Sequence, residues 1–127
     1  MKVVDASVII KVLLTEQDSE KAKQLLQEKV MVPEIMFVEV ANTLATKTDF
    51  PVEKIEQGLD LVYKLELKVE STTQETLIKA ARLSREKGTA VYDMIYAVLA
   101  QKKKVQLITA DRKFKQKVNW NFVKLLG

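Results

Sequence analysis

The sequence predicts an α/β fold, specifically a three-layer α/β/α arrangement with a central parallel sheet of four to five strands. Short apolar segments alternate with longer segments of helical periodicity along the chain, which is typical of parallel strands covered by helices on both faces. The length of 127 residues is that of one ordinary domain, and 47% of the residues are hydrophobic, enough to fill a core. No linker, repeat or low-complexity tract divides the chain, so we predict a single domain over residues 1–127.

Five short segments are the expected strands. Each is rich in Val, Ile or Leu, as buried parallel strands usually are. Pro33 follows the second segment, and we expect it at the first position of the next helix, where the missing backbone N–H costs nothing. The expected strands are 2–5, 30–32, a segment within 65–70, 105–109 and 122–125.

The longer segments between the strands are the expected helices. Asp18 or Ser19 is suited to cap the second helix, and Thr72 or Thr73 the fifth, because their side chains can accept from free N–H groups. Gly88 is expected to end the fifth helix. The expected helices are 7–14, about 19–29, 33–47, 51–64, 73–87, 91–102 and 112–117.

The residue types that are missing restrict the possible chemistry. The chain has no cysteine and no histidine, which excludes disulfides, thiol nucleophiles, cysteine zinc sites and a Ser-His-Asp triad. Its three glycines lie too far apart for a phosphate-binding loop. An enzyme of this composition would depend on carboxylates, acting through a hard cation that oxygen ligands hold.

The charge and the hydropathy pattern indicate a partner and a location. A net charge of +4 and a pI near 9.2 suit a polyanionic partner, although the excess is modest. No apolar run approaches the roughly 20 residues that a membrane span requires. The first segment, from Lys2 to Asp5, resembles a strand rather than a signal peptide. We therefore expect a cytoplasmic protein with no role in a membrane.

Two acids follow expected strands directly. Asp5 stands at the carboxyl end of the first strand, and Asp111 at the carboxyl end of the fourth. Ligands of open parallel sheets bind beside such strand ends, where the strand order reverses. Each acid is also well suited to cap the helix that follows it, and both interpretations stay open at this point.

Two further acids interrupt apolar helical segments. Glu39 lies within the apolar segment 35–41, and Asp93 within 90–98. A buried, unpaired carboxylate is costly, so a partner ion or a function is expected to compensate. Asp93 also suits the first turn of its helix, where the dipole favours an acid. Glu39 has the alternative of pairing with a buried Lys or Arg.

Convergence of these acids would favour a divalent cation. Four neighbouring carboxylates repel one another, and Mg²⁺ prefers a few carboxylates, retained waters and phosphate oxygens. Such a site lowers the pKa of water and offsets charge on a phosphodiester in the transition state. Without histidine, metal-activated water is the expected nucleophile. We call these residues the acidic quartet: Asp5, Glu39, Asp93 and Asp111.

The segments around the acidic quartet together resemble the PIN domain family, and within it the VapC-type toxin ribonucleases. The resemblance extends over nearly the whole chain. The residues that carry it are MKVVDAS at 1–7, PE at 33–34 with EVAN at 39–42, VYDMIY at 91–96 with LA at 99–100, and LITADRKF at 107–114.

The resemblance implies a sheet in which the first and fourth strands are adjacent. It also implies an acidic quartet that binds one or two Mg²⁺ or Mn²⁺ ions, and an endoribonuclease that leaves a 5′-phosphate and a 3′-hydroxyl. In the toxin branch it implies a homodimer and a cognate antitoxin that blocks the site. Ser7 and Thr109 match polar positions that support the acids.

Basic and aromatic residues near the acids have two interpretations each. Arg112 and Lys113 follow the last acid and are expected to contact the RNA backbone without reading its sequence. The lysines at 102–104 are better explained as offsetting a helix dipole. Tyr92 and Tyr96 share a helical face, where packing is favoured over stacking on bases.

Three other classes of protein are alternatives to a metal-dependent nuclease. A phosphoacceptor receiver domain would need an acidic pair after the first strand and an acceptor Asp after the third, and the sequence has neither. A phosphatase with a DxD nucleophile would need an acid where Ser7 stands. A non-catalytic RNA- or protein-binding module remains as the alternative, and stabilisation by metal would distinguish an enzyme from it.

Overall fold

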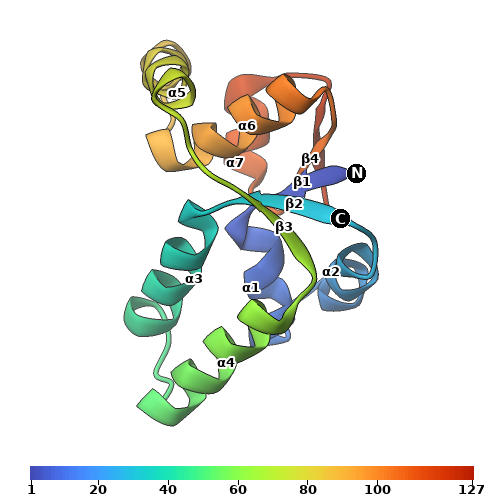
Figure 1. The fold of residues 1–127 in the computed structure, drawn as a ribbon. Helices are drawn as coiled ribbons and strands as arrows, with labels where there is room; N and C mark the ends of the chain where they lie inside the picture. The colour runs from blue at the N-terminus through green and yellow to red at the C-terminus, as the bar shows by residue number, and fades with distance from the viewer.

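The computed structural model describes residues 1–127 and contains five strands and seven helices (Figure 1). The strands are β1 (Lys2–Val4), β2 (Val30–Pro33), β3 (Leu67–Glu70), β4 (Leu107–Thr109) and β5 (Val123–Leu125). The helices are α1 (Ala6–Leu14), α2 (Ser19–Leu26), α3 (Ile35–Thr46), α4 (Val52–Lys64), α5 (Gln74–Lys87), α6 (Val91–Lys103) and α7 (Arg112–Val118). Each expected strand and helix is therefore present.

All five strands are parallel and lie in the order β3-β2-β1-β4-β5. From β1 the chain adds β2 and β3 on one side and then crosses to place β4 on the other. The switch in strand order therefore lies between β1 and β4. Val3 pairs with Leu107 and Val4 with Ile108 across this junction, so the two strands end at the same edge.

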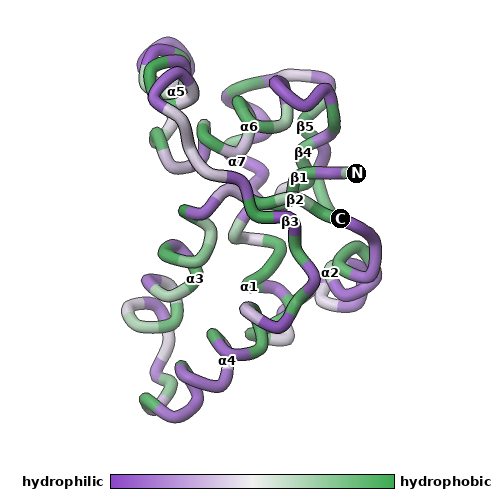
Figure 2. Tube along the Cα trace, in the orientation of Figure 1, coloured by the Kyte–Doolittle hydropathy of each residue, from purple (hydrophilic) through white to green (hydrophobic).

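Helices cover both faces of the sheet, as the sequence predicts. Figure 1 shows α1 to α4 on one side and α5 to α7 on the other. In Figure 2 β2 and β4 are mainly hydrophobic, β3 at the edge of the sheet alternates between hydrophobic and hydrophilic residues, and the outward faces of the helices are mainly hydrophilic. The fold is the three-layer α/β/α sandwich of the sequence prediction.

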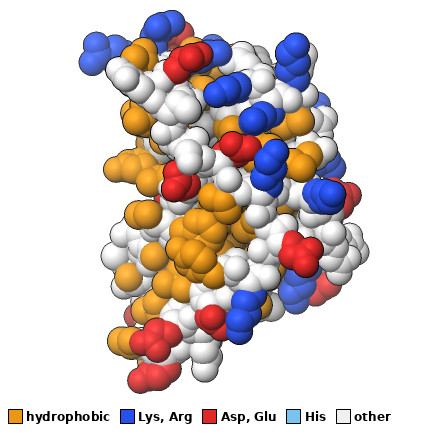
Figure 3. Space-filling view, in the orientation of Figure 1, with side chains coloured by type: hydrophobic (Ala, Val, Ile, Leu, Met, Phe, Trp, Pro, Cys, Tyr) orange, Lys and Arg blue, Asp and Glu red, His pale blue; other side chains and the backbone are white.

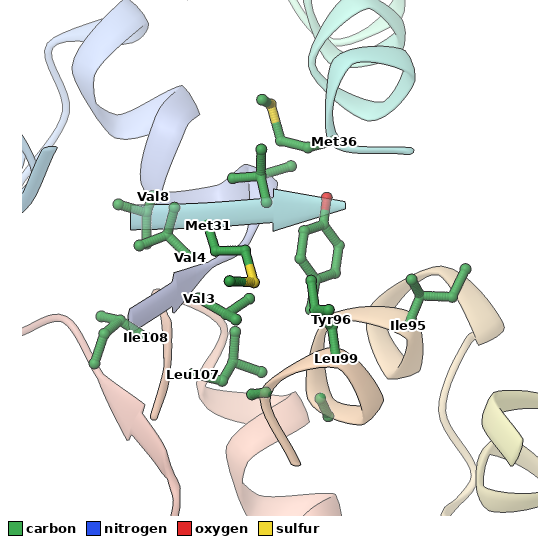
Figure 4. Close-up of a cluster of buried hydrophobic side chains, with 14 of the residues drawn as sticks. Val3, Val4, Val8, Met31, Met36, Ile95, Tyr96, Leu99, Leu107 and Ile108 are labelled. Atoms are coloured by element: carbon green, nitrogen blue, oxygen red, sulfur yellow. The ribbon is translucent and has the colours of Figure 1, made fainter. Parts of the chain in front are cut away.

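The hydrophobic core contains 26 buried residues and is centred on β1, β2, β4 and α6. Figure 4 shows part of it: Val3 and Met31 of the sheet lie on the side of Tyr96 and Leu99 of α6, whereas Val4 lies beside Val8 of α1 on the other face. Helix α6 is buried from Met94 to Ala100 without interruption, because α5 packs on the side that faces away from the sheet. This explains why the sequence of α6 is apolar nearly all round.

The prediction for Pro33 was wrong, whereas Asp18 does occupy the N-cap position of α2. Pro33 ends β2 instead of starting a helix. Proline has no backbone N–H, but the pairing with β3 does not need one at this position. The bond to β3 is donated by the next residue, Glu34, whose N–H bonds to the Glu70 carbonyl at 3.1 Å. Asp18 precedes α2 in a left-handed conformation and makes no side-chain cap. Its carboxylate instead lies 3.7 Å from the Lys21 ammonium.

The molecular surface is not uniform. Figure 3 shows hydrophobic side chains gathered over the region of α3, α4 and β3, where Val38, Leu61, Tyr63 and Val69 are exposed. No helix is both long and apolar enough to cross a bilayer.

Candidate functional site

One cavity brings the whole acidic quartet together. It has a volume of about 510 Å³ and lies beside the carboxyl ends of β1 and β4, at the switch in strand order. This is the position where open parallel sheets bind ligands. Residues that line it include Asp5, Glu39, Asp93 and Asp111.

Asp5 links β1 to α1 and caps that helix. Its carboxylate accepts from the Ser7 N–H at 3.1 Å and also from the Ser7 hydroxyl. The pKa of Asp5 is raised to about 6, chiefly by burial and also by the nearby Asp93 charge, while hydrogen bonds from Ser7 and Thr109 oppose the rise. Asp5 is thus both a cap, as weighed from the sequence, and a destabilised charge in the cavity.

Ser7 and Thr109 join the ends of β1 and β4. The Ser7 hydroxyl oxygen accepts from the Ala110 N–H at 2.9 Å and lies 3.5 Å from the Thr109 hydroxyl. Thr109 in turn accepts from the Asp111 N–H at 3.0 Å. The two hydroxyls therefore fix the backbone from which Asp5 and Asp111 project.

Asp111 is held in a similar way to Asp5. Its carboxylate caps α7 by accepting from the Phe114 N–H at 3.1 Å. The second carboxylate oxygen has no protein hydrogen bond in the structure. The cap orients the carboxylate and leaves one oxygen free for a ligand.

Glu39 has a neutral partner instead of a buried cation. The Tyr96 hydroxyl donates to Glu39 Oε1 at 2.5 Å, and Figure 4 shows the Tyr96 ring projecting from α6 with its oxygen directed away from that helix. Burial raises the pKa of Glu39, as do the charges of Asp93 and Asp5, whereas the bond from Tyr96 lowers it. Burial and the Glu39 charge also hold the pKa of Tyr96 well above its usual value.

The role of Tyr96 was not identified from the sequence. Packing was favoured for it, and the side chain is indeed 1% exposed, but its bond to Glu39 was not foreseen. The signal was present, because a buried tyrosine usually finds a partner for its hydroxyl. Tyr92, one turn earlier, is 58% exposed and lines the cavity.

Asp93 lies in the first turn of α6, where the helix dipole favours a carboxylate. Its pKa is nevertheless raised, first by burial and then by the charge of Asp111, while Lys117 opposes the rise. The dipole therefore does not remove the cost of holding this charge in the cavity.

The cavity offers only oxygen donors for a metal. No Lys or Arg lines it, and no member of the acidic quartet takes part in an ion pair. Asn42 and Thr43 add neutral oxygens to the lining. This donor set fits a hard divalent cation such as Mg²⁺, although no three acids lie close enough together in the structure to hold one ion.

The two basic residues expected to contact RNA lie in different places. Lys113 lines a small cavity together with Asp93 and Asp111. Arg112 lines another, with Lys11, Asp18 and the C-terminal residues. Of the two, only Lys113 shares a cavity with members of the acidic quartet.

Fold and site together define a parallel α/β domain with an acidic cavity at the switch in its strand order. Residues 2–119 match the PIN domain family, and the chain belongs to that family. The resemblance seen in the sequence is thereby confirmed at the level of the family. No curated protein sequence matches the chain.

Solved structures of similar fold include several from toxin-antitoxin systems. A toxin-antitoxin complex from Klebsiella pneumoniae aligns with a TM-score of 0.76 at 19% identity, over 100% of this chain and 98% of that one. VapC20 of Mycobacterium tuberculosis, a toxin that cleaves the sarcin-ricin loop, aligns with a TM-score of 0.72 at 18% identity, over 91% of this chain and 94% of that one. VapBC2 from Rickettsia felis, bound to a DNA fragment from its promoter, aligns with a TM-score of 0.68 at 17% identity, over 98% of this chain and 96% of that one. At these identities the likeness shows the fold.

We predict that Asp5→Asn stabilises the metal-free protein. The pKa of Asp5 rises from 3.8 to about 6 on folding, so the folded state binds more protons between these pH values and loses stability as the pH rises through them. Asparagine preserves the cap and cannot ionise, so at pH 7 the free energy of unfolding should increase by about 1–3 kcal/mol. Chemical denaturation from pH 4 to 7 measures this. Asp49→Asn, at an exposed position, is the control and should change little.

We predict that Tyr96→Phe raises the pKa of Glu39. The variant keeps the ring in the core and removes the one hydrogen bond that lowers this pKa, at a cost of about 1 kcal/mol in stability. Carboxyl carbon shifts followed by NMR titration report the change directly. Tyr92→Phe, on the same helix, should leave the titration of Glu39 unchanged; an equal shift in both variants would contradict the role given to Tyr96.

Proposed function

We propose that this protein is a metal-dependent endoribonuclease that hydrolyses RNA phosphodiester bonds with water, using Mg²⁺ or Mn²⁺. The observation that carries the proposal is the acidic cavity, which four carboxylates line without any of them forming an ion pair. Carboxylates whose pKa is raised by burial and by one another in a cavity are typical of functional sites. RNA, a polyanion, is the substrate that best suits the net charge of +4.

The acidic quartet would hold the metal, and the surrounding residues would position these ligands. A bound divalent cation supplies activated water and offsets negative charge on the phosphodiester. Ser7 and Thr109 fix Asp5 and Asp111 at adjacent strand ends. Tyr96 holds one oxygen of Glu39 and leaves the other available. The expected products are a 5′-phosphate and a 3′-hydroxyl.

We further propose that the protein is the toxin of a toxin-antitoxin pair and acts in the cytoplasm as a homodimer. Support comes from the structural likeness to the toxin-antitoxin complex of K. pneumoniae and to VapBC2 of R. felis. The exposed apolar side chains over α3, α4 and β3 also favour a protein partner, because large apolar patches commonly mark interaction surfaces.

A non-catalytic RNA- or protein-binding module is the second candidate function. The observation that favours it is that no three acids approach closely enough to hold one ion. In such a module the acids would serve as helix caps and hydrogen-bond acceptors only. Metal would then neither bind in the cavity nor change the thermal stability of the protein.

Cleavage of a mixed RNA pool tests the proposal. With Mg²⁺ or Mn²⁺ we expect cleavage that EDTA stops. In Asp93→Asn the rate of cleavage should fall by at least about a hundredfold, which is on the order of the effect of losing one electrostatic contact to a transition state. Asp49→Asn is the matched control. Cleavage that persists in EDTA and in Asp93→Asn would indicate a contaminating nuclease. Absence of both cleavage and metal-dependent stabilisation would favour the binding module.

A further inference from the structure

A second cavity adjoins the acidic one and differs from it in charge. It has a volume of about 170 Å³ and shares two acids with its neighbour. Lysines line its other side, whereas no cation lines the larger cavity. The residues that matter here are Thr89, Ala90, Asp93, Asp111, Lys113 and Lys117.

The two lysines are available for a ligand. None of the six ion pairs in the structure involves Lys113 or Lys117, although two carboxylates line the same cavity. The Lys117 ammonium donates to the Gly88 carbonyl at 2.8 Å, which holds it at the cavity beside the end of α5. Its charge acts on Asp93 from there.

Neutral donors complete the same cavity. The hydroxyl oxygen of Thr89 is buried and has no hydrogen-bond partner. Ala90 precedes α6 without a side-chain cap, so the first N–H groups of α6 are not satisfied by a capping side chain. Two ammonium groups, a free hydroxyl and an uncapped helix start are donors that suit one anion with several oxygens.

We propose that this cavity, which we call the lysine subsite, binds one backbone phosphate of the RNA, adjacent to the phosphodiester that lies over the acidic quartet. This inference rests on the proposed function, because it names where the strand continues beyond the acids. The strand would run from the larger cavity, past Asp93 and Asp111, to Lys113 and Lys117. A base is a poorer ligand here, since five of the seven lining residues are polar or charged and Tyr92 lies in the larger cavity.

RNA binding in EDTA tests the lysine subsite separately from cleavage. The affinity of a single-stranded RNA is measured by fluorescence anisotropy at increasing salt for Lys113→Met, Lys117→Met and the control Lys124→Met, an exposed lysine on β5. Each subsite variant should reduce the slope of log K against log salt by about 0.7, the contribution of one phosphate contact on a single strand. The control should keep the slope of the parent, and Lys117→Arg should restore it.

Replacing single phosphates by neutral methylphosphonates locates the contact. In the parent, one position next to the cleaved bond should show a clear loss of affinity, and in Lys117→Met that loss should disappear. In cleavage assays the subsite variants should raise KM with little change in kcat. Lys113→Met is expected to fold like the parent, because Lys113 is exposed and makes no hydrogen bond or ion pair in the structure. A loss of binding in this variant therefore cannot be attributed to a folding defect.

The outcomes separate the two proposals. If the parent cleaves RNA and the three methionine variants share its salt slope, the lysine subsite is wrong and the nuclease proposal stands. If the parent binds RNA through these lysines and never cleaves it, the subsite stands and the nuclease proposal is wrong. If the parent neither binds RNA in EDTA nor cleaves it with Mg²⁺ or Mn²⁺, both are wrong.

Discussion

The parallel pairing of β1 with β4 determines where the chemistry of this protein lies. Because Val4 is in register with Ile108, the chain leaves both strands at the same edge of the sheet. Asp5 and Asp111 then occupy equivalent positions at the starts of α1 and α7. The switch in strand order, a property of the chain path alone, places two acids side by side.

The core stabilises an arrangement that the acids themselves oppose. The pKa of three of the four acids is raised, and burial is the largest cause in each case. The residues that press them together, among them Val3, Val4 and Leu107, are completely buried. Burial of apolar surface contributes about 25 cal/mol per Å², so a well-filled core can hold several unfavourable charges in place.

Much of the candidate site was predictable from the residues alone. Asp5 and Asp111 stand directly after expected strands, and Glu39 and Asp93 interrupt apolar helices, so each departs from the local pattern in a way that is visible in sequence. Contacts between distant residues were not visible. The bond between Tyr96 and Glu39 spans 57 positions, and no local pattern indicates it.

The directions in which side chains point could not be predicted from the sequence either. Arg112 and Lys113 are neighbours in sequence, yet the start of α7 sends them into different cavities. Proline is locally suited to the start of a helix, and this local rule alone predicts Pro33 there. In the structure Pro33 pairs with Glu70 of β3, so β2 extends past the last residue that pairs with β1. Periodicity reports which elements exist, and tertiary pairing decides where they end.

Three acids of the quartet have a structural task that needs no metal. Asp5 and Asp111 cap helices, and Glu39 accepts from Tyr96. These bonds hold one oxygen of each of these three carboxylates to the scaffold, whereas Asp93 has no such bond and lies in the first turn of α6. The scaffold bonds thus give three of the four carboxylates a role in the metal-free fold, and the second oxygens of Glu39 and Asp111 carry no protein hydrogen bond.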